Sequence, residues 1–164
     1  KPNATPASGT AQTSNKVVSP LSGPLLLTDV PGSPRDGGKR KHMGVDLAAS
    51  MNTPIRSPID GSITGRGEDY VGGLNITVEG GGVWHRFFHL NQINVQRFQT
   101  VKAGDVIGLT GNTGHDQGKR VGPHLHWEMK VNNNYQNPLD YYNMQYAWAP
   151  GHGPNASASA KKKS

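Results

Sequence analysis

The sequence predicts a mainly β fold, a single antiparallel β-sheet domain, on three observations. The 164-residue chain contains 22 Gly and 12 Pro, which separate short apolar runs. None of these runs keeps a 3.6-residue period long enough for a core helix. Several of them instead alternate polar and apolar residues with period two, which is typical of half-buried strands.

Both ends of the chain offer little apolar surface to bury. Residues 1–16 are mostly Ala, Ser, Thr, Asn, Pro and Gly, a composition typical of linkers. The composition shifts in the same way from Gly151 onward. We therefore expect a domain over 17–149, between a flexible linker or arm at 1–16 and a flexible basic tail at 150–164.

Strands are expected near 44–48, 54–65, 73–79, 83–90, 105–110 and 124–131. Pro54 and Pro58 place the second of these at a sheet edge or divide it, because proline lacks the N–H that a ladder needs. Residues 111–122 hold four glycines and predict a long loop. A short terminal helix is expected to begin within 137–142.

The chain is basic, with a formal net charge of +6 and a pI near 9.7, which favours attraction to polyanions. Part of this charge lies in two runs, Lys39 to Lys41 and Lys161 to Lys163. No aromatic residues interleave with either run, so a nucleic-acid groove is not expected. No apolar run reaches the 18 residues of a membrane span. The oligomeric state stays open.

Residues 122–131 predict a strand with two different faces. After a Gly-Pro start that disfavours helix, His124, His126 and Glu128 share one face, and three apolar residues share the other. Buried imidazoles without partners cost free energy, so we expect the polar face to line a cleft. Another part of the chain should meet these histidines there.

His42 and Asp46 are the first candidates for that second part. Residues four apart share a face in a helix and in a strand, and the Gly44 to Leu47 pattern favours an extended backbone. Together with His126 they supply two imidazole nitrogens and one carboxylate oxygen. This is a three-protein-ligand set typical of catalytic Zn²⁺, with a fourth position left for water.

A second histidine-bearing strand is predicted over 83–90, whose alternation places His85 and His89 on one face. It therefore offers one or two further imidazoles. His85 itself is expected at the surface or at the edge of the core. His115 and His152 fall in the predicted loop and tail, and no role is assigned to them.

Four motifs together resemble a known family. They are His42-Met43-Gly44-Val45-Asp46-Leu47-Ala48, Phe88-His89-Leu90, Gly108-Leu109-Thr110-Gly111-Asn112-Thr113-Gly114 and Gly122-Pro123-His124-Leu125-His126-Trp127-Glu128. Their order and spacing over about residues 40–140 are similar to those of lysostaphin-type (LytM-like) zinc peptidoglycan endopeptidases. The resemblance implies a β-sheet domain with a zinc site on the floor of a groove. It implies His42, Asp46 and His126 as Zn²⁺ ligands and His89 and His124 as catalytic histidines.

The function implied is hydrolysis of peptide bonds in the cross-links or stem peptides of bacterial peptidoglycan. The expected location is extracytoplasmic: cell envelope, periplasm or secreted. One alternative is an inactive peptidoglycan-binding or hydrolase-activating domain of the same fold, and a second is a virion-associated wall hydrolase of a phage. A carrier or structural β-domain would not explain the histidines. The bond cleaved, and which of the two catalytic histidines is the general base, stay open.

Two departures from the family pattern are visible. The stretch between Gly114 and Gly122 is longer than usual, which affects the shape of one groove wall. His85 is not part of the pattern.

Overall fold

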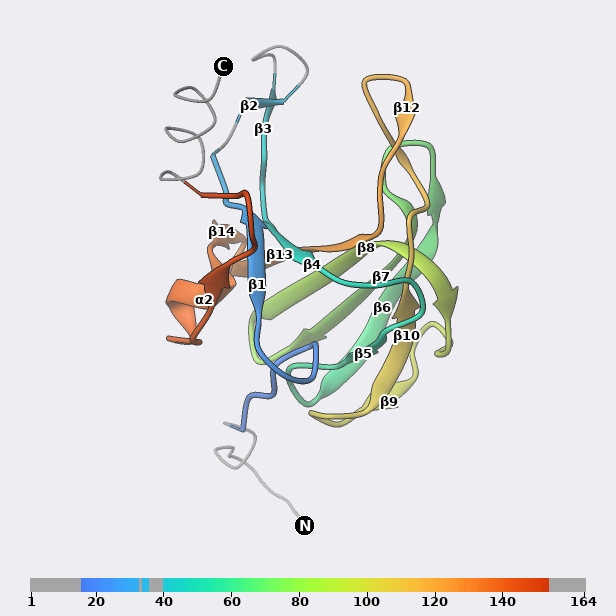
Figure 1. The fold of residues 1–164 in the computed structure, drawn as a ribbon. Helices are drawn as coiled ribbons and strands as arrows, with labels where there is room; N and C mark the ends of the chain where they lie inside the picture. The colour runs from blue at the N-terminus through green and yellow to red at the C-terminus, as the bar shows by residue number, and fades with distance from the viewer. Residues whose placement is uncertain (1–15, 33, 36–39, 154–164) are drawn as a thin grey trace, which may run out of the picture.

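A computed structural model describes residues 16–32, 34–35 and 40–153, and the mainly β prediction is confirmed. One large sheet has the strand order β15-β1-β4-β13-β8-β7-β6-β9, with β5, β10 and β14 attached to it (Figure 1). Its strands are β1 (Leu26–Asp29), β4 (Val45–Ala48), β5 (Pro54–Arg56), β6 (Gly61–Asp69), β7 (Gly73–Gly80), β8 (Val83–Ile93), β9 (Thr100–Val101), β10 (Val106–Thr110), β13 (His124–Val131), β14 (Asn134–Gln136) and β15 (Ala147–Trp148). Pairing is antiparallel except between β1 and β15, which are parallel.

The six strands expected from the sequence are all present. The stretch 54–65 is divided into β5 and β6, with Pro58 between them, and the two halves pair with different neighbours, β10 and β7. The strands that were not predicted are short, and β9 and β15 lie at the two ends of the strand order. The predicted arms lie for the most part outside the described residues, so the domain limits 17 and 149 stay a prediction.

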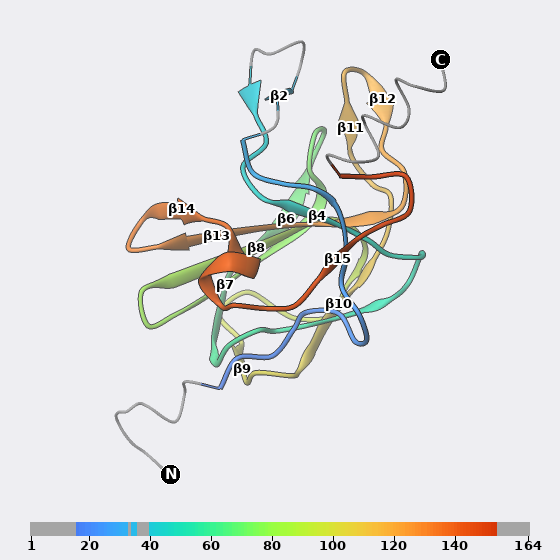
Figure 2. The ribbon, with the colours of Figure 1, turned by 60° about the vertical axis from the view of Figure 1, so that its left-hand side comes forward.

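Two small hairpins stand above the large sheet. Strand β2 (Pro34–Arg35) pairs with β3 (Arg40–Lys41), and β11 (His115–Asp116) pairs with β12 (Lys119–Arg120). They rise on either side of β4 (Figures 1 and 2). The long loop predicted over 111–122 thus contains a short hairpin, because the middle of this stretch pairs with itself.

The core lies beneath β4, β8 and β13. Leu125, Trp127 and Met129 are fully buried, which confirms the apolar face predicted for β13. Phe87 of β8 stacks on Trp127 with 5.9 Å between ring centroids. The opposite faces of β8 and β13 are thereby left for the polar residues of the site.

The expected terminal helix is α2 (Pro138–Tyr141), a single turn. Asn137 caps it, since its side-chain oxygen accepts hydrogen bonds from the backbone N–H groups of Leu139 and Asp140. In the described part of the chain no helix is long and apolar enough to cross a membrane.

His85 is a core residue rather than a surface or edge residue, with no exposed area. The indole N–H of Trp127 donates to its Nδ1 at 3.0 Å, so Nε2 carries the ring proton and donates to the Tyr142 hydroxyl at 3.0 Å. Burial lowers the pKa of His85 to about 3. The imidazole is therefore neutral and links β8, β13 and the end of α2.

Candidate functional site

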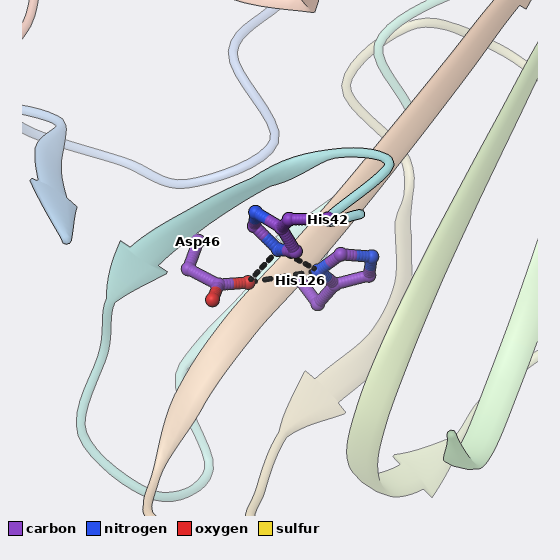
Figure 3. Close-up of side chains that lie close together, drawn as sticks. All are labelled: His42, Asp46 and His126. Atoms are coloured by element: carbon purple, nitrogen blue, oxygen red, sulfur yellow. Dashed lines mark hydrogen bonds and ion pairs between the residues drawn. The ribbon is translucent and has the colours of Figure 1, made fainter. Parts of the chain in front are cut away.

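Three side chains converge where β4 pairs with the start of β13 (Figure 3). Asp46 and His126 are direct partners in the β4–β13 register, and His42 lies just before β4. Asp46 Oδ1 is 3.1 Å from His42 Nε2 and 2.8 Å from His126 Nδ1, and the two nitrogens are 2.9 Å apart. The structure thus brings together the three residues that the sequence singled out as metal ligands.

Gly44 permits this convergence. A Cβ at this position would lie 2.3 Å from the carbonyl oxygen of Trp127, far inside contact distance. Because Gly44 has no side chain, the segment from His42 to Asp46 can lie directly against β13. The motif therefore requires glycine at this position, because any side chain would collide with β13.

In both histidines, the hydrogen bond at the outer ring nitrogen decides which form the nitrogen facing Asp46 can take. His42 Nδ1 is 2.9 Å from the carbonyl oxygen of Val30, and His126 Nε2 is 2.8 Å from Glu128 Oε2. Carbonyl and carboxylate oxygens only accept, so these two ring nitrogens carry the protons. When both rings are neutral, as metal binding requires, the lone pairs of His42 Nε2 and His126 Nδ1 face Asp46, which is the arrangement found around bound metals.

The spacing of the three converging atoms is compatible with Zn²⁺. Zinc bonds of about 2.0–2.1 Å at tetrahedral angles separate ligand atoms by about 3.3–3.4 Å, close to the 2.8–3.1 Å found here. Three electron-pair donors this close repel one another unless a proton or a cation lies among them. Of the described residues, these three alone form a group that could hold a metal ion.

The electrostatics of the group favour a positive charge. Burial opposes ionisation of Asp46, but hydrogen bonds from His126 and His42 and the charge of His126 outweigh it and hold its pKa well below the usual range. Burial also opposes protonation of His126, and the carboxylates of Asp46 and Glu128 outweigh it and raise its pKa to about 9. A metal ion that binds here must displace that proton.

His124 and His89 lie beside the three ligand candidates, with 4.7 Å between their ring centroids. His124 Nδ1 donates to the carbonyl oxygen of Gly122 and His89 Nδ1 to that of Thr113, each at 2.8 Å. In its neutral form each ring therefore has its lone pair on Nε2. His124 Nε2 is 3.6 Å from Asp46 Oδ1. Burial lowers the pKa of His89 to about 4, and the neighbouring His124 adds to this effect, so His89 is neutral at pH 7.

A β-bulge brings His89 to the site. Between the pairs Ile76–Phe87 and Leu74–Leu90, β8 advances three residues while β7 advances two. His89 has a φ of +68°, which is uncommon for a residue with a side chain. The expectation that His85 and His89 share a face was wrong, because the bulge breaks the alternation: His85 enters the core and His89 lines the cleft.

The five side chains line one cleft with a volume of about 240 Å³. Its other lining residues are Met43, Asp69, Val71, Gly72, Phe88, His115, Asp116, Val121 and Glu128. His115 belongs to β11 and stacks on Tyr70 at 4.0 Å, whereas His152 is exposed near the end of the described chain. The sequence assigned no role to Phe88 or His115, since the bulge and the hairpin that place them leave no periodic pattern. The sequence could have indicated Glu128 as a cleft residue, because it lies on the same face of the predicted strand as His126.

The sequence model of peptidase family M23 matches residues 40–138, more than half of the chain. The chain belongs to peptidase family M23. This M23 chain is 35% identical to the glycyl-glycine endopeptidase ALE-1 of Staphylococcus capitis over 122 residues, 73% of this chain and 32% of that protein. It is 37% identical to the peptidoglycan DD-endopeptidase ShyA of Vibrio cholerae over 91 residues, 55% of this chain and 20% of ShyA.

The fold is also similar to that of a solved peptidase structure. A zinc-containing peptidase from Vibrio cholerae superposes with a TM-score of 0.66 at 26% identity, over 80% of this chain and 40% of that one. The M23 chain thus spans about a third of the length of ALE-1 and about a fifth of that of ShyA.

Proposed function

We propose that this M23 chain is a zinc-dependent endopeptidase that hydrolyses peptide bonds in bacterial peptidoglycan, in its cross-links or stem peptides. The observation that carries the proposal is that three side chains able to hold a metal ion and the rings of His89 and His124 line one cleft. The names of the relatives, a glycyl-glycine endopeptidase and a peptidoglycan DD-endopeptidase, support the substrate class.

In this proposal His42, Asp46 and His126 hold Zn²⁺. A bound zinc ion makes water a usable nucleophile at neutral pH and polarises the scissile carbonyl. Val30 and Glu128 keep the two histidine rings oriented through the hydrogen bonds at their outer nitrogens.

His124 and His89 act on the proton and on the substrate. His124 Nε2 lies next to the ligand atoms, so it takes the proton of the attacking water and passes it to the leaving amine. His89 is neutral and its Nδ1–H is engaged by Thr113, so its Nε2 accepts a hydrogen bond that orients water or substrate.

The proposed setting is extracytoplasmic, in the cell envelope, periplasm or outside the cell, because peptidoglycan lies there. We propose that residues 17–149 form the peptidase domain. An inactive binding or activating domain of this fold would be favoured by the loss of a ligand or catalytic position, and all five positions are filled. For a phage virion hydrolase, the reaction and the site would be the same.

Alanine substitutions separate the ligands from the catalysts. His126→Ala and Asp46→Ala should lose bound zinc and wall hydrolysis together, since two ligands are not enough to hold the ion. His124→Ala should keep zinc, and its kcat should fall by about 100-fold or more, which is the rate acceleration that a general base usually contributes. Zinc content is measured by atomic absorption, and mass spectrometry of the fragments released from two purified wall types identifies the bond.

His152→Ala is the matched control, since it removes an exposed imidazole outside the cleft. It should keep zinc and activity. Hydrolysis at the starting rate by His124→Ala would show that the catalytic role is misassigned. A zinc-loaded chain that releases no peptide fragments from any wall would favour the binding or activating alternative.

A further inference from the structure

A strip of aromatic and cationic side chains leads away from the cleft along the open face of the sheet. His85 and Phe87 of β8 are buried in the core, so the residues that alternate with them lie on the other face. Lys130 of β13 pairs with Trp84 of β8 on one side and with Tyr135 of β14 on the other. We call the following residues the cation–π strip: Phe88, Arg86, Trp84, Lys130 and Tyr135.

The contacts along the strip are continuous from the candidate metal centre outward. The ring of Phe88 is 5.0 Å from that of His126. Arg86 Cζ lies 5.0 Å from the Phe88 ring and 6.0 Å from the Trp84 ring. Lys130 Nζ lies 5.0 Å from the Trp84 ring and 4.7 Å from the Tyr135 ring. Each cation therefore rests against two aromatic rings, which restrict its position.

In the described part of the chain, neither cation of the strip forms an ion pair with a carboxylate within 4.0 Å. Glu128 stands opposite Arg86 in the β13–β8 register, but its Oε2 accepts from His126. Arg86 donates to Asn75 Oδ1 through Nη2 at 3.3 Å, and its buried Nε has no partner. Neither Arg86 nor Lys130 is thus engaged in a direct ion pair with another described residue, although Glu128 lies next to Arg86.

The spacing of the two cations matches an extended peptide. Arg86 pairs with Glu128, two residues along β13 from His126, and Lys130 is four residues from it. At about 3.4 Å per residue these positions lie about 7 and 14 Å from the metal centre along the strand. A peptide bound in extended form repeats at the same rise, so groups two and four residues from its scissile bond would reach Arg86 and Lys130.

We propose that the cation–π strip binds the free carboxylates of an acidic peptide that extends from the metal centre along the sheet. Carboxylates are the acceptors that guanidinium and ammonium groups bind most strongly among peptide groups. This inference rests on the proposed endopeptidase function. It narrows the substrate to peptides that carry free carboxylates, such as acidic stem peptides, in preference to neutral chains such as oligoglycine.

The test uses the zinc-loaded protein and synthetic peptides with one common scissile bond. The peptides carry free carboxylates or the corresponding amides two and four residues from that bond, on either side of it. We expect the best acidic peptide to have a kcat/KM about tenfold or more above that of its amide counterpart. A ratio of about tenfold is what the energy of one charge-assisted hydrogen bond provides. The ratio should fall as salt is added, because salt screens exposed charges.

Lys130→Met should reduce the ratio several-fold, and Lys130→Glu should reduce it further by repulsion. Lys102→Met is the control, because it removes the same charge from an exposed residue in the turn before β10. Its ratio should equal that of the unmodified chain. Thermal melts of all variants verify that they fold.

Equal rates for acidic and amidated peptides would overturn the inference and leave the endopeptidase function standing. If no peptide is cleaved while zinc is bound, the proposed function fails. Binding of fluorescent acidic and amidated peptides then decides the inference by itself. Tighter binding of the acidic peptide that is lost in Lys130→Met supports the strip, and equal binding overturns it.

Discussion

Glu128 shows how a residue outside the proposed ligand set can orient one of its members. Its carboxylate accepts the Nε2–H of His126, and this leaves Nδ1 as the ring nitrogen that faces Asp46 and His42. Without that acceptor the ring could rotate or take the other tautomer, and either change removes one lone pair from the site. Outer hydrogen bonds of this kind commonly account for a substantial part of metal affinity.

Replacing Glu128 by alanine should therefore raise the zinc dissociation constant by about 10–100-fold. Glu128→Gln should give a smaller rise, because its amide oxygen can still accept from Nε2. Competition with a chromogenic chelator measures both. Glu79→Ala on β7 is the control, since Glu79 is exposed and carries the same charge. Unchanged affinity in Glu128→Ala would mean that His126 is oriented without it.

At the scale of elements, the β11–β12 hairpin forms one side of the cleft without belonging to the large sheet. Its strands pair only with each other. Its base is held because His115 stacks on Tyr70 and donates through Nδ1 to the Tyr70 carbonyl oxygen at 2.9 Å. Residues 116–120 are exposed. The hairpin can therefore shape substrate binding while contributing little to the core.

Shortening this hairpin tests whether it affects substrate binding while having little effect on stability. His115 and Arg120 are paired, so replacing Asp116 to Lys119 by Asn-Gly leaves a two-residue turn across the same pair. We expect a stability loss below about 1 kcal/mol, or about 2–4 °C in Tm, because only exposed residues are removed. Zinc affinity should not change, and KM for wall peptides should rise several-fold with little effect on kcat.

Steady-state kinetics and calorimetry measure these quantities, and Lys102→Met serves again as a surface control. An unchanged KM would show that the hairpin does not contact the substrate. Loss of zinc would show that the hairpin supports the metal centre.

Across the whole molecule, the Trp127–His85–Tyr142 chain of hydrogen bonds joins the strand that bears His126 to the end of α2. Both bonds need a neutral imidazole with its proton on Nε2. Protonation of Nδ1 would break the bond from Trp127 and leave a charge in the core, which costs several kcal/mol. The fold is therefore coupled to pH through a residue far from solvent.

His85 should make the protein less stable in acid. Its pKa is about 3 in the folded state and about 6.5 when unfolded, so the unfolded chain binds the extra proton between these values. The contribution to stability is complete above pH 6.5 and is lost as the pH falls towards 3. The slope from this residue is at most about 1.4 kcal/mol per pH unit.

Denaturant unfolding of metal-free protein between pH 7.5 and 4.5 measures this slope, with His85→Gln as the comparison. Glutamine can accept from Trp127 and donate to Tyr142 but does not titrate. The variant should lose less stability on acidification, and the difference isolates His85 from His89 and the ligand group, which titrate in both proteins. Parallel curves would show that His85 does not couple folding to pH.

The sequence by itself was enough to predict the features that depend on periodicity or on a linear motif. The alternation in 124–131 correctly predicted a strand with an apolar face and a histidine face, because side-chain direction repeats every two residues in any strand. The spacing of His42 and Asp46, with His126 in its motif, indicated the three side chains that the fold brings together. Their roles as ligands stay a proposal.

Other features depend on contacts between distant segments, and the tertiary structure decided them. The bulge that turns His89 into the cleft arises from the register of β8 on β7. His85 is buried because Trp127 and Tyr142, 42 and 57 residues away, supply its partners. The cation–π strip requires β8, β13 and β14 to lie side by side. A sequence pattern reports the direction of a side chain within its own strand, but register and neighbours are set by pairing across the sheet.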